Sequence, residues 1–369
     1  RVAGTDQKER IPRSYSTQMQ VMINTLNDIR TSDKQISGTH GIGVLMANSL
    51  MFQRFPDHNG YDDPQFSSFY GQTLPLLKRG IPVELVHMEN TPFKDTFNGL
   101  QVLVMSYSNM KPMKSEYHNY LADWVKKGGT LVYCGEDVDP YQTVLEWWNT
   151  EGNAYKAPSE HLFEAMGLSR NPGDGIYRFG KGTVIVMRED PKHFVLKGGN
   201  DRKYFETIAS AYESKTGKKI EIKNNFMVER GPYTIAAVMD ESSSKEPLKL
   251  SGLYIDLFDK DLPVLTVKQI NPGEQGYLYD LNKVSGKVKA KVLCGASRIY
   301  DEKVGKQSYS FVAKSPLHTT NVSRVLLPRK PGKVLVNGKA EQPEWDESSK
   351  TLLLSFENDP AGVNVSIEW

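Results

Sequence analysis

The segment from Leu121 to Gly135, LADWVKKGGTLVYCG, constrains the fold more than any other part of the chain. Its first half has apolar side chains at helical spacing, including Trp124 and Val125. Two glycines then end the predicted helix. The run TLVYCG that follows is continuously apolar, as expected of a strand buried on both faces. The segment therefore predicts an α/β domain with a parallel sheet.

The first half of the chain repeats this alternation of helices and buried strands. Four further runs have the same strand character: residues 41–48, 81–88, 100–107 and 182–187. Repeated βα units predict a flavodoxin-like parallel sheet with helices on both faces, over residues 39–223. Any ligand of such a sheet binds outside the carboxyl ends of the strands.

Residues 1–38 contain one amphipathic segment, SYSTQMQVMINTLNDIR. We expect a helix here, because apolar residues recur at helical spacing. The chain begins without Met and without an apolar signal segment, so we expect residues 1–38 to be a leader or linker from a missing upstream domain. The pattern places these apolar residues on one helical face: Met19, Met22, Ile23, Leu26 and Ile29.

From residue 224 to 369 the pattern changes to short strands with turns between them, which predicts an antiparallel β-sandwich domain. The run GKVKAKV alternates lysines with apolar residues, as in a strand with one wet face. Asn337–Gly338 is a two-residue hairpin signal, and Val363, Val365 and Ile367 alternate near the end of the chain.

Composition gives no reason to expect nucleic acid or an anionic membrane as a partner. The chain has 46 basic and 44 acidic residues, so its net charge is only +2. No apolar run approaches the roughly 20 residues that span a bilayer. Gly38, Gly41 and Gly43 do not follow a strand and form no dinucleotide fingerprint, and we expect no cofactor.

The segments GIGVLMANSLMFQRF, LLKRGIPVE and LADWVKKGGTLVYCGEDVDPY resemble the class I glutamine amidotransferase-like domain of large bacterial glycoside hydrolases. The clearest relatives are β-galactosidases whose middle domain serves in trimerisation. The resemblance implies a non-catalytic, structural and oligomerisation portion of a carbohydrate-active enzyme, whose (β/α)₈ catalytic barrel is absent from this chain. It also implies a homo-oligomer in the periplasm or outside the cell.

Cys134 stands where class I amidotransferases carry their nucleophile. A nucleophile elbow needs small residues two positions to either side, and Val132 and Glu136 stand there instead. No H-x-E motif follows the last α/β strand. We therefore expect no catalytic residue in this chain, and a cysteine-dependent hydrolase or amidotransferase is an alternative.

Three carboxylates, Glu136, Asp137 and Asp139, follow the strand that ends at Cys134. Carboxylates at the end of a sheet can bind a hard cation. The competing interpretation is a solvated loop before Pro140 in which Asp139 caps the next helix. We expect no metal, and these three residues are the weak candidates for one.

A carbohydrate-binding module is a second alternative, with a site at the strand ends. Aromatic rings stack on sugars, and adjacent aromatic residues on a helix point in different directions, so one of a pair belongs to the core. The candidate ligand-binding residues are Ser106, Tyr107, Trp147 and Trp148.

The segment SLMFQRF follows the first predicted strand, where a loop is normally polar. An apolar patch at such a place either folds back onto the core or contacts another copy of the chain. The candidate interface residues are Leu50, Met51, Phe52 and Phe55.

Overall fold

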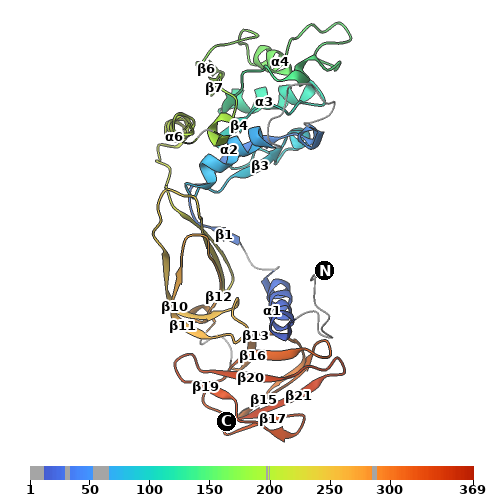
Figure 1. Cartoon of the computed structure of the whole chain (residues 1–369), viewed down its shortest axis with the longest axis vertical. Helices are drawn as coiled ribbons and strands as arrows, with labels where there is room; N and C mark the ends of the chain where they lie inside the picture. The colour runs from blue at the N-terminus through green and yellow to red at the C-terminus, as the bar shows by residue number, and fades with distance from the viewer. Residues whose placement is uncertain (1–11, 30–33, 53–65, 197, 199, 285–288) are drawn as a thin grey trace. The chain divides into compact units, whose positions relative to one another are not determined.

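The structure is a computed structural model that describes residues 12–29, 34–52, 66–196, 198, 200–284 and 289–369, without the side chains of residues 51 and 52. The chain groups into two compact units (Figure 1). The α/β unit comprises residues 37–226 and 241–244. The β-rich unit comprises the described residues up to Ile36, with 227–240 and 245–369. The predicted boundaries at residues 38 and 223 stay predictions.

The α/β unit contains a six-stranded sheet in which all five predicted strands are present. Five parallel strands lie in the order β3-β2-β4-β5-β7, and β6, which was not predicted, pairs antiparallel with β7 at the edge. The strands are β2 (Ile42–Met46), β3 (Glu84–His87), β4 (Val102–Met105), β5 (Thr130–Cys134), β6 (Gly175–Phe179) and β7 (Gly182–Met187).

Most helices of this unit lie between its strands along the chain, and α5 and α6 follow its last strand. Gly128 has a φ of 125° just beyond the end of α3, which confirms the predicted glycine stop. The helices are η1 (Asn48–Phe52), α2 (Ser67–Leu77), η2 (Met88–Asn90), α3 (Glu116–Lys126), η3 (Pro140–Thr143), α4 (Pro158–Ala165), α5 (His193–Leu196) and α6 (Arg202–Thr216).

The central strands β2, β4 and β5 are buried on both faces of the sheet, between which their side chains alternate. Along β5, Leu131 and Tyr133 join one apolar core with residues of α3 and α4. Val132 and Cys134 join the other with residues of α2 and α6. The continuous apolar character of the predicted strands is explained by this two-sided burial.

The β-rich unit contains three antiparallel sheets. The six-stranded sheet has the order β1-β8-β9-β12-β10-β11 and consists of β1 (Lys34–Ile36), β8 (Asn225–Arg230), β9 (Tyr233–Val238), β10 (Leu248–Asp256), β11 (Val264–Ile270) and β12 (Gln275–Asp280). The short helix η4 (Leu281–Lys283) follows β12.

The other two sheets share one apolar core, so they pack face to face as a sandwich. The four-stranded sheet, in the order β13-β16-β20-β19, consists of β13 (Lys291–Gly295), β16 (Thr320–Leu326), β20 (Thr351–Glu357) and β19 (Glu344–Asp346). The five-stranded sheet, in the order β14-β15-β21-β17-β18, consists of β14 (Arg298–Val304), β15 (Ser308–Lys314), β21 (Val363–Glu368), β17 (Lys333–Val336) and β18 (Lys339–Ala340).

The structure confirms some of the strands and turns predicted for residues 224–369 and differs at others. The hairpin at Asn337–Gly338 joins β17 to β18, and both residues have a positive φ. Val363, Val365 and Ile367 are buried as predicted. Part of GKVKAKV lies outside the described residues, and β13 begins only at Lys291. The expected β-rich region is present, with three sheets where one two-sheet sandwich was predicted.

The N-terminal helix is present as α1 (Arg13–Ile29), but only part of its apolar face is buried: Ile29 is 4% exposed, and Met22 packs against the same core. Met19, Ile23 and Leu26 are 41%, 39% and 55% exposed. The buried residues of the helix are Thr17, Val21, Thr25 and Ile29, and the helix packs on β13 and β16. In the part of the chain that the structure describes, no helix combines the length and the apolar character needed to cross a membrane.

Candidate functional site

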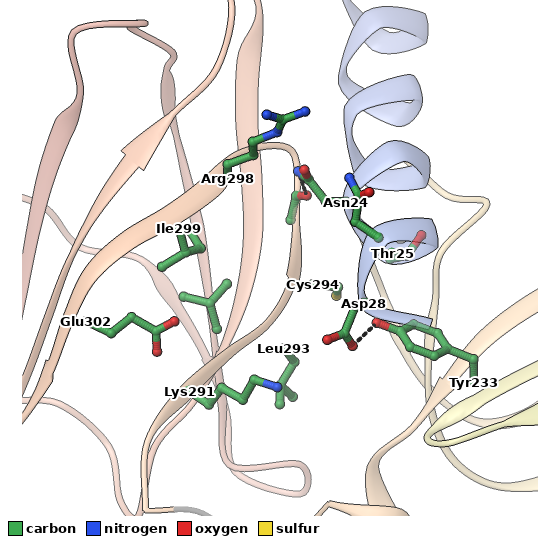
Figure 2. A pocket seen from close by; sticks show the side chains of 13 residues that line it. Asn24, Thr25, Asp28, Tyr233, Lys291, Leu293, Cys294, Arg298, Ile299 and Glu302 are labelled. Atoms are coloured by element: carbon green, nitrogen blue, oxygen red, sulfur yellow. Dashed lines mark hydrogen bonds between the residues drawn. The ribbon is translucent and has the colours of Figure 1, made fainter. Parts of the chain in front are cut away.

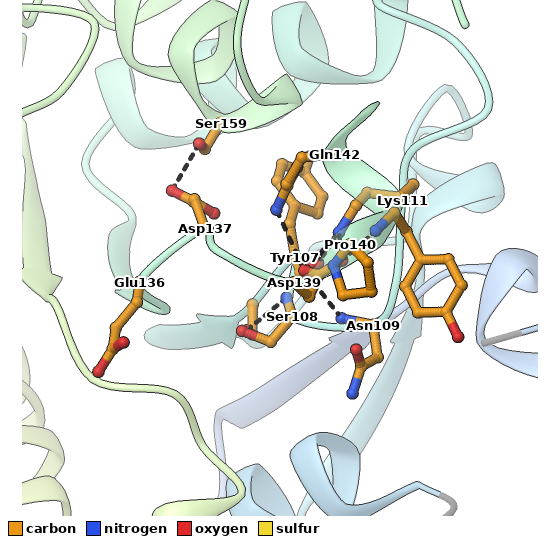
Figure 3. A network of polar contacts seen from close by, with 12 residues as sticks. Tyr107, Ser108, Asn109, Lys111, Glu136, Asp137, Asp139, Pro140, Gln142 and Ser159 are labelled. Atoms are coloured by element: carbon orange, nitrogen blue, oxygen red, sulfur yellow. Dashed lines mark hydrogen bonds and ion pairs between the residues drawn. The ribbon is translucent and has the colours of Figure 1, made fainter. Parts of the chain in front are cut away.

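The carboxyl ends of β4, β5 and β7 lead into loops that form a network of polar contacts (Figure 3). In a sheet of parallel strands these ends lie at one edge, which is where ligands of such folds bind. The predicted carboxylates and the predicted ligand-binding residues Ser106 and Tyr107 all belong to these loops or border them.

A buried ion pair forms one part of this network. Lys111 Nζ lies 2.8 Å from Oδ2 and 3.1 Å from Oδ1 of Asp139. The ammonium also donates to the carbonyl oxygen of Tyr107, and Asp139 accepts from the backbone N–H of Tyr141, at 3.1 Å. Asp139 is therefore the N-cap of η3, as one of the two sequence interpretations expected.

Asp137 is neutralised by a second cation. Arg188 Nη1 and Ser159 Oγ each lie 2.7 Å from its Oδ2, and the hydroxyl of Tyr133 donates to its Oδ1. Glu136 is exposed (Figure 3). Two of the three carboxylates are thus paired with a lysine or arginine side chain, so the loop is organised as a network of protein contacts. The described residues contain no group of three or more acidic, His or Cys side chains arranged to bind a metal ion.

Cys134 is fully buried at the end of β5. Burial raises the pKa of its thiol far above the ordinary value, and the negative charges of Glu189, Asp174 and Asp190 raise it further. The thiolate is the nucleophilic form of cysteine. At neutral pH the side chain is thus a protonated, inaccessible thiol that packs as a small apolar group.

The predicted ligand-binding residues are mostly interior. Ser106, Tyr107 and Trp148 are at most 2% exposed, and Trp147 is half-buried. The indole N–H of Trp148 donates to the carbonyl oxygen of Gln142 at 3.0 Å. As in the sequence interpretation of the tryptophan pair, one of the two belongs to the core. Ligand binding by these four residues stays a prediction, and a sugar could reach only Trp147 without rearrangement.

The structure brings together two histidines that the sequence pattern left unconnected. His118 Nδ1 and His161 Nδ1 are 2.8 Å apart, and the hydroxyl of Tyr107 is 2.6 Å from His118 Nε2. Trp147 contacts both imidazole rings edge to face. Burial lowers the pKa of both histidines, and the mutual interaction lowers that of His118 further.

No local sequence signal could have found this pair. His118 lies in α3 and His161 in α4, 43 residues apart. Only the packing of these two helices against the same face of the sheet brings their side chains together.

The candidate interface residues are only partly described. Leu50 is 5% exposed and belongs to the core of the α/β unit. The side chains of Met51 and Phe52, and all of Phe55, lie outside the described residues. The interface role of this segment stays a prediction.

In comparisons with known proteins, the chain is similar only to solved structures, and the similarity is low. No model of a protein family matches the chain, and no curated protein matches it. Among solved structures, the β-galactosidase from Bacillus circulans sp. alkalophilus is similar, with a TM-score of 0.40 and 10% identity over 66% of this chain and 42% of that chain.

Two further β-galactosidases are similar to the same degree. The enzyme from Rahnella sp. R3 has a TM-score of 0.40 and 12% identity, over 70% of this chain and 42% of its own. The enzyme from the psychrophilic Marinomonas ef1 has a TM-score of 0.39 and 11% identity, over 71% and 41%. The chain thus spans about two fifths of the length of these proteins. TM-scores this low assign neither a fold nor an activity to the chain.

Proposed function

We propose that this chain is the non-catalytic, structural portion of a glycoside hydrolase-related protein, and that its α/β unit is a flavodoxin-like, amidotransferase-like domain. The strand order β3-β2-β4-β5-β7 carries the fold part of the proposal. Counted along the unit it is 2-1-3-4-5, the order of flavodoxin-like sheets. Cys134 lies at the end of the fourth of these strands, where the sequence resemblance would put the amidotransferase nucleophile.

The side chains at the carboxyl ends of the strands support a role without catalysis. A nucleophilic cysteine needs an exposed thiolate and an adjacent base. The Cys134 thiol is buried, and its pKa is raised far above the ordinary value by burial and by acidic neighbours. The carboxylates of Asp137 and Asp139 are each paired with a cationic side chain, so their oxygens are already engaged within the protein.

The assembly part of the proposal comes from the sequence resemblance. The α/β unit would contact its own copies in a homo-oligomer, in a periplasmic or extracellular protein of bacterial type. Light scattering of the purified chain over a range of concentrations tests this part. We expect an oligomer, and a chain that stays monomeric at high concentration would overturn the assembly role.

Turnover assays test the absence of catalysis. The purified chain should release no chromophore from aryl glycosides and should not hydrolyse glutamine. Glutamine hydrolysis that disappears in Cys134→Ala, and persists in the matched buried-cysteine variant Cys294→Ala, would overturn the proposal in favour of a cysteine-dependent hydrolase. Glycoside cleavage abolished by a single carboxylate substitution would overturn it in favour of a glycosidase.

A further inference from the structure

A cavity of about 440 Å³ lies within the β-rich unit, between the last turns of α1 and strands β13 and β14 (Figure 2). Its volume is within the range of small-molecule sites. The cavity belongs to a different unit from the polar network at the sheet ends, and the proposed function does not use it. Asn24 and Asp28 line it from α1, Tyr233 from β9, and Lys291 and Arg298 from the strands.

Two cationic side chains of this cavity have no side-chain partner in the part of the chain that the structure describes. Among the described residues, neither Arg298 nor Lys291 forms an ion pair or a side-chain hydrogen bond. An arginine has five N–H donors in a planar fork, and a lysine has three. The cavity therefore offers unused donors along β13 and β14.

Two carboxylates of the same cavity are only partly engaged. The hydroxyl of Tyr233 donates to Oδ2 of Asp28 at 2.7 Å, and the hydroxyl of Tyr309 donates to Oε2 of Glu302 at 2.8 Å. No donor among the described residues reaches the second oxygen of either carboxylate, which therefore stays available as an acceptor. No ion pair of 4 Å or less joins these carboxylates to Arg298 or Lys291 in the described part of the chain, so opposite charges line the cavity without neutralising each other.

The backbone and apolar side chains of β13 and the start of β14 complete the lining. Val292, Leu293 and Cys294 are at most 8% exposed, and Ile299 is half-buried beside them. The amide of Asn24 donates to the carbonyl oxygen of Gly295 at 2.9 Å, which holds the end of α1 beside the strand. The walls thus combine a small apolar surface with convergent donors and acceptors, as in sites for small polar ligands.

We propose that this cavity binds a neutral saccharide. A sugar hydroxyl donates one hydrogen bond and accepts others, so neighbouring hydroxyls of one ring can satisfy the carboxylates and the cations together. The charges of the two cations and the two carboxylates balance. An anionic ligand would therefore be repelled by Asp28 and Glu302, and a cationic ligand by Arg298 and Lys291. The apolar residues of β13 and β14 provide a surface for the C–H groups of the ring.

The binding test uses the whole purified chain with methyl α-glucoside, methyl β-galactoside and maltose, followed by saturation-transfer NMR and calorimetry. Glucuronate, glucosamine and L-alanine serve as anionic, cationic and zwitterionic comparisons. We expect at least one neutral sugar to bind more tightly than its charged counterparts. Binding of none of the neutral sugars, or tighter binding of glucuronate, glucosamine or L-alanine, would overturn the proposal.

Matched variants locate the site. Arg298→Gln and Asp28→Asn should each weaken sugar binding about tenfold or more, because each removes hydrogen bonds to a charged group. Both residues are exposed, so the variants should fold. Arg329→Gln and Asp261→Asn change exposed residues of the same unit outside the cavity and should bind like the wild type. Sugar binding unchanged in both cavity variants would overturn the assignment to this cavity.

Discussion

Lys111 Nζ lies 2.8 Å from Oδ2 of Asp139, and both side chains are almost completely removed from solvent. Lys111 belongs to the segment after β4, and Asp139 to the segment after β5 (Figure 3). The ion pair therefore ties together the carboxyl ends of two neighbouring strands. It also limits ligand binding by the loop, because the carboxylate of Asp139 is already paired with a cationic side chain.

Lys111→Met should destabilise the α/β unit by about 3–5 kcal/mol, because it leaves the buried carboxylate of Asp139 without its counter-charge. Urea unfolding followed by tryptophan fluorescence measures this, since Trp124, Trp147 and Trp148 all belong to this unit. The double variant Lys111→Met/Asp139→Asn removes both charges and should recover much of the loss. A single variant as stable as the wild type would show that the pair is dispensable.

The packing face of α1 gives a second prediction, with a matched pair of substitutions in one helix. Val21 is 1% exposed and Leu26 is 55% exposed. Val21→Ala should lower the free energy of unfolding of the β-rich unit by about 2 kcal/mol, because it leaves a cavity against β13 and β16. Leu26→Ala should change it by about 0.5 kcal/mol or less. Thermal melts monitored by circular dichroism measure the loss of stability in each variant. A larger loss in Leu26→Ala than in Val21→Ala would show that Leu26, and not Val21, lies on the packed face.

The contrast in α1 shows what periodicity can and cannot predict. The repeat of apolar residues predicted the helix correctly. The apolar face is buried only in part, because the contacts of α1 are partly polar: Thr17 Oγ1 donates to the carbonyl oxygen of Thr320 at 2.9 Å. Small hydrogen-bonding side chains can approach a sheet closely, and hydrophobicity alone does not detect them.

The parallel strands were predictable because two-sided burial leaves a continuous apolar run. The edge strand β6 was missed, since Ile176 is 71% exposed and the strand alternates exposed with half-buried residues. The candidate site was predictable only as a location. The ion pairs could not be predicted, because each joins loops that are distant in the sequence. Asp137 and Arg188, which follow different strands, are an example.

The contact between α2 and α5 gives a third prediction. A Cβ atom at Gly71 would lie 1.8 Å from the carbonyl oxygen of Pro191. Gly71→Ala must push α2 away from the turn that precedes α5 and should cost about 2 kcal/mol or more. Gly173→Ala is the matched control, because a Cβ there meets no atom within 4 Å. It should be neutral or stabilising by about 0.5 kcal/mol. Equal urea midpoints for the two variants would contradict the close packing.

The histidine pair predicts how stability depends on pH. Burial holds the pKa of His118 and of His161 below the ordinary value. As the pH falls below about 6.5, the unfolded chain takes up protons that the folded chain resists, so the α/β unit should lose stability progressively.

His118→Gln tests this dependence directly. The amide can still accept from the hydroxyl of Tyr107 and donate to His161, but it does not titrate. The free energy of unfolding of the variant should therefore fall less steeply between pH 7 and pH 5 than that of the wild type. A comparison at pH 8, where histidine is neutral in both states, isolates the cost of altered packing. Identical slopes in the acid range would show that His118 binds protons equally in the folded and unfolded chain, which its complete burial opposes.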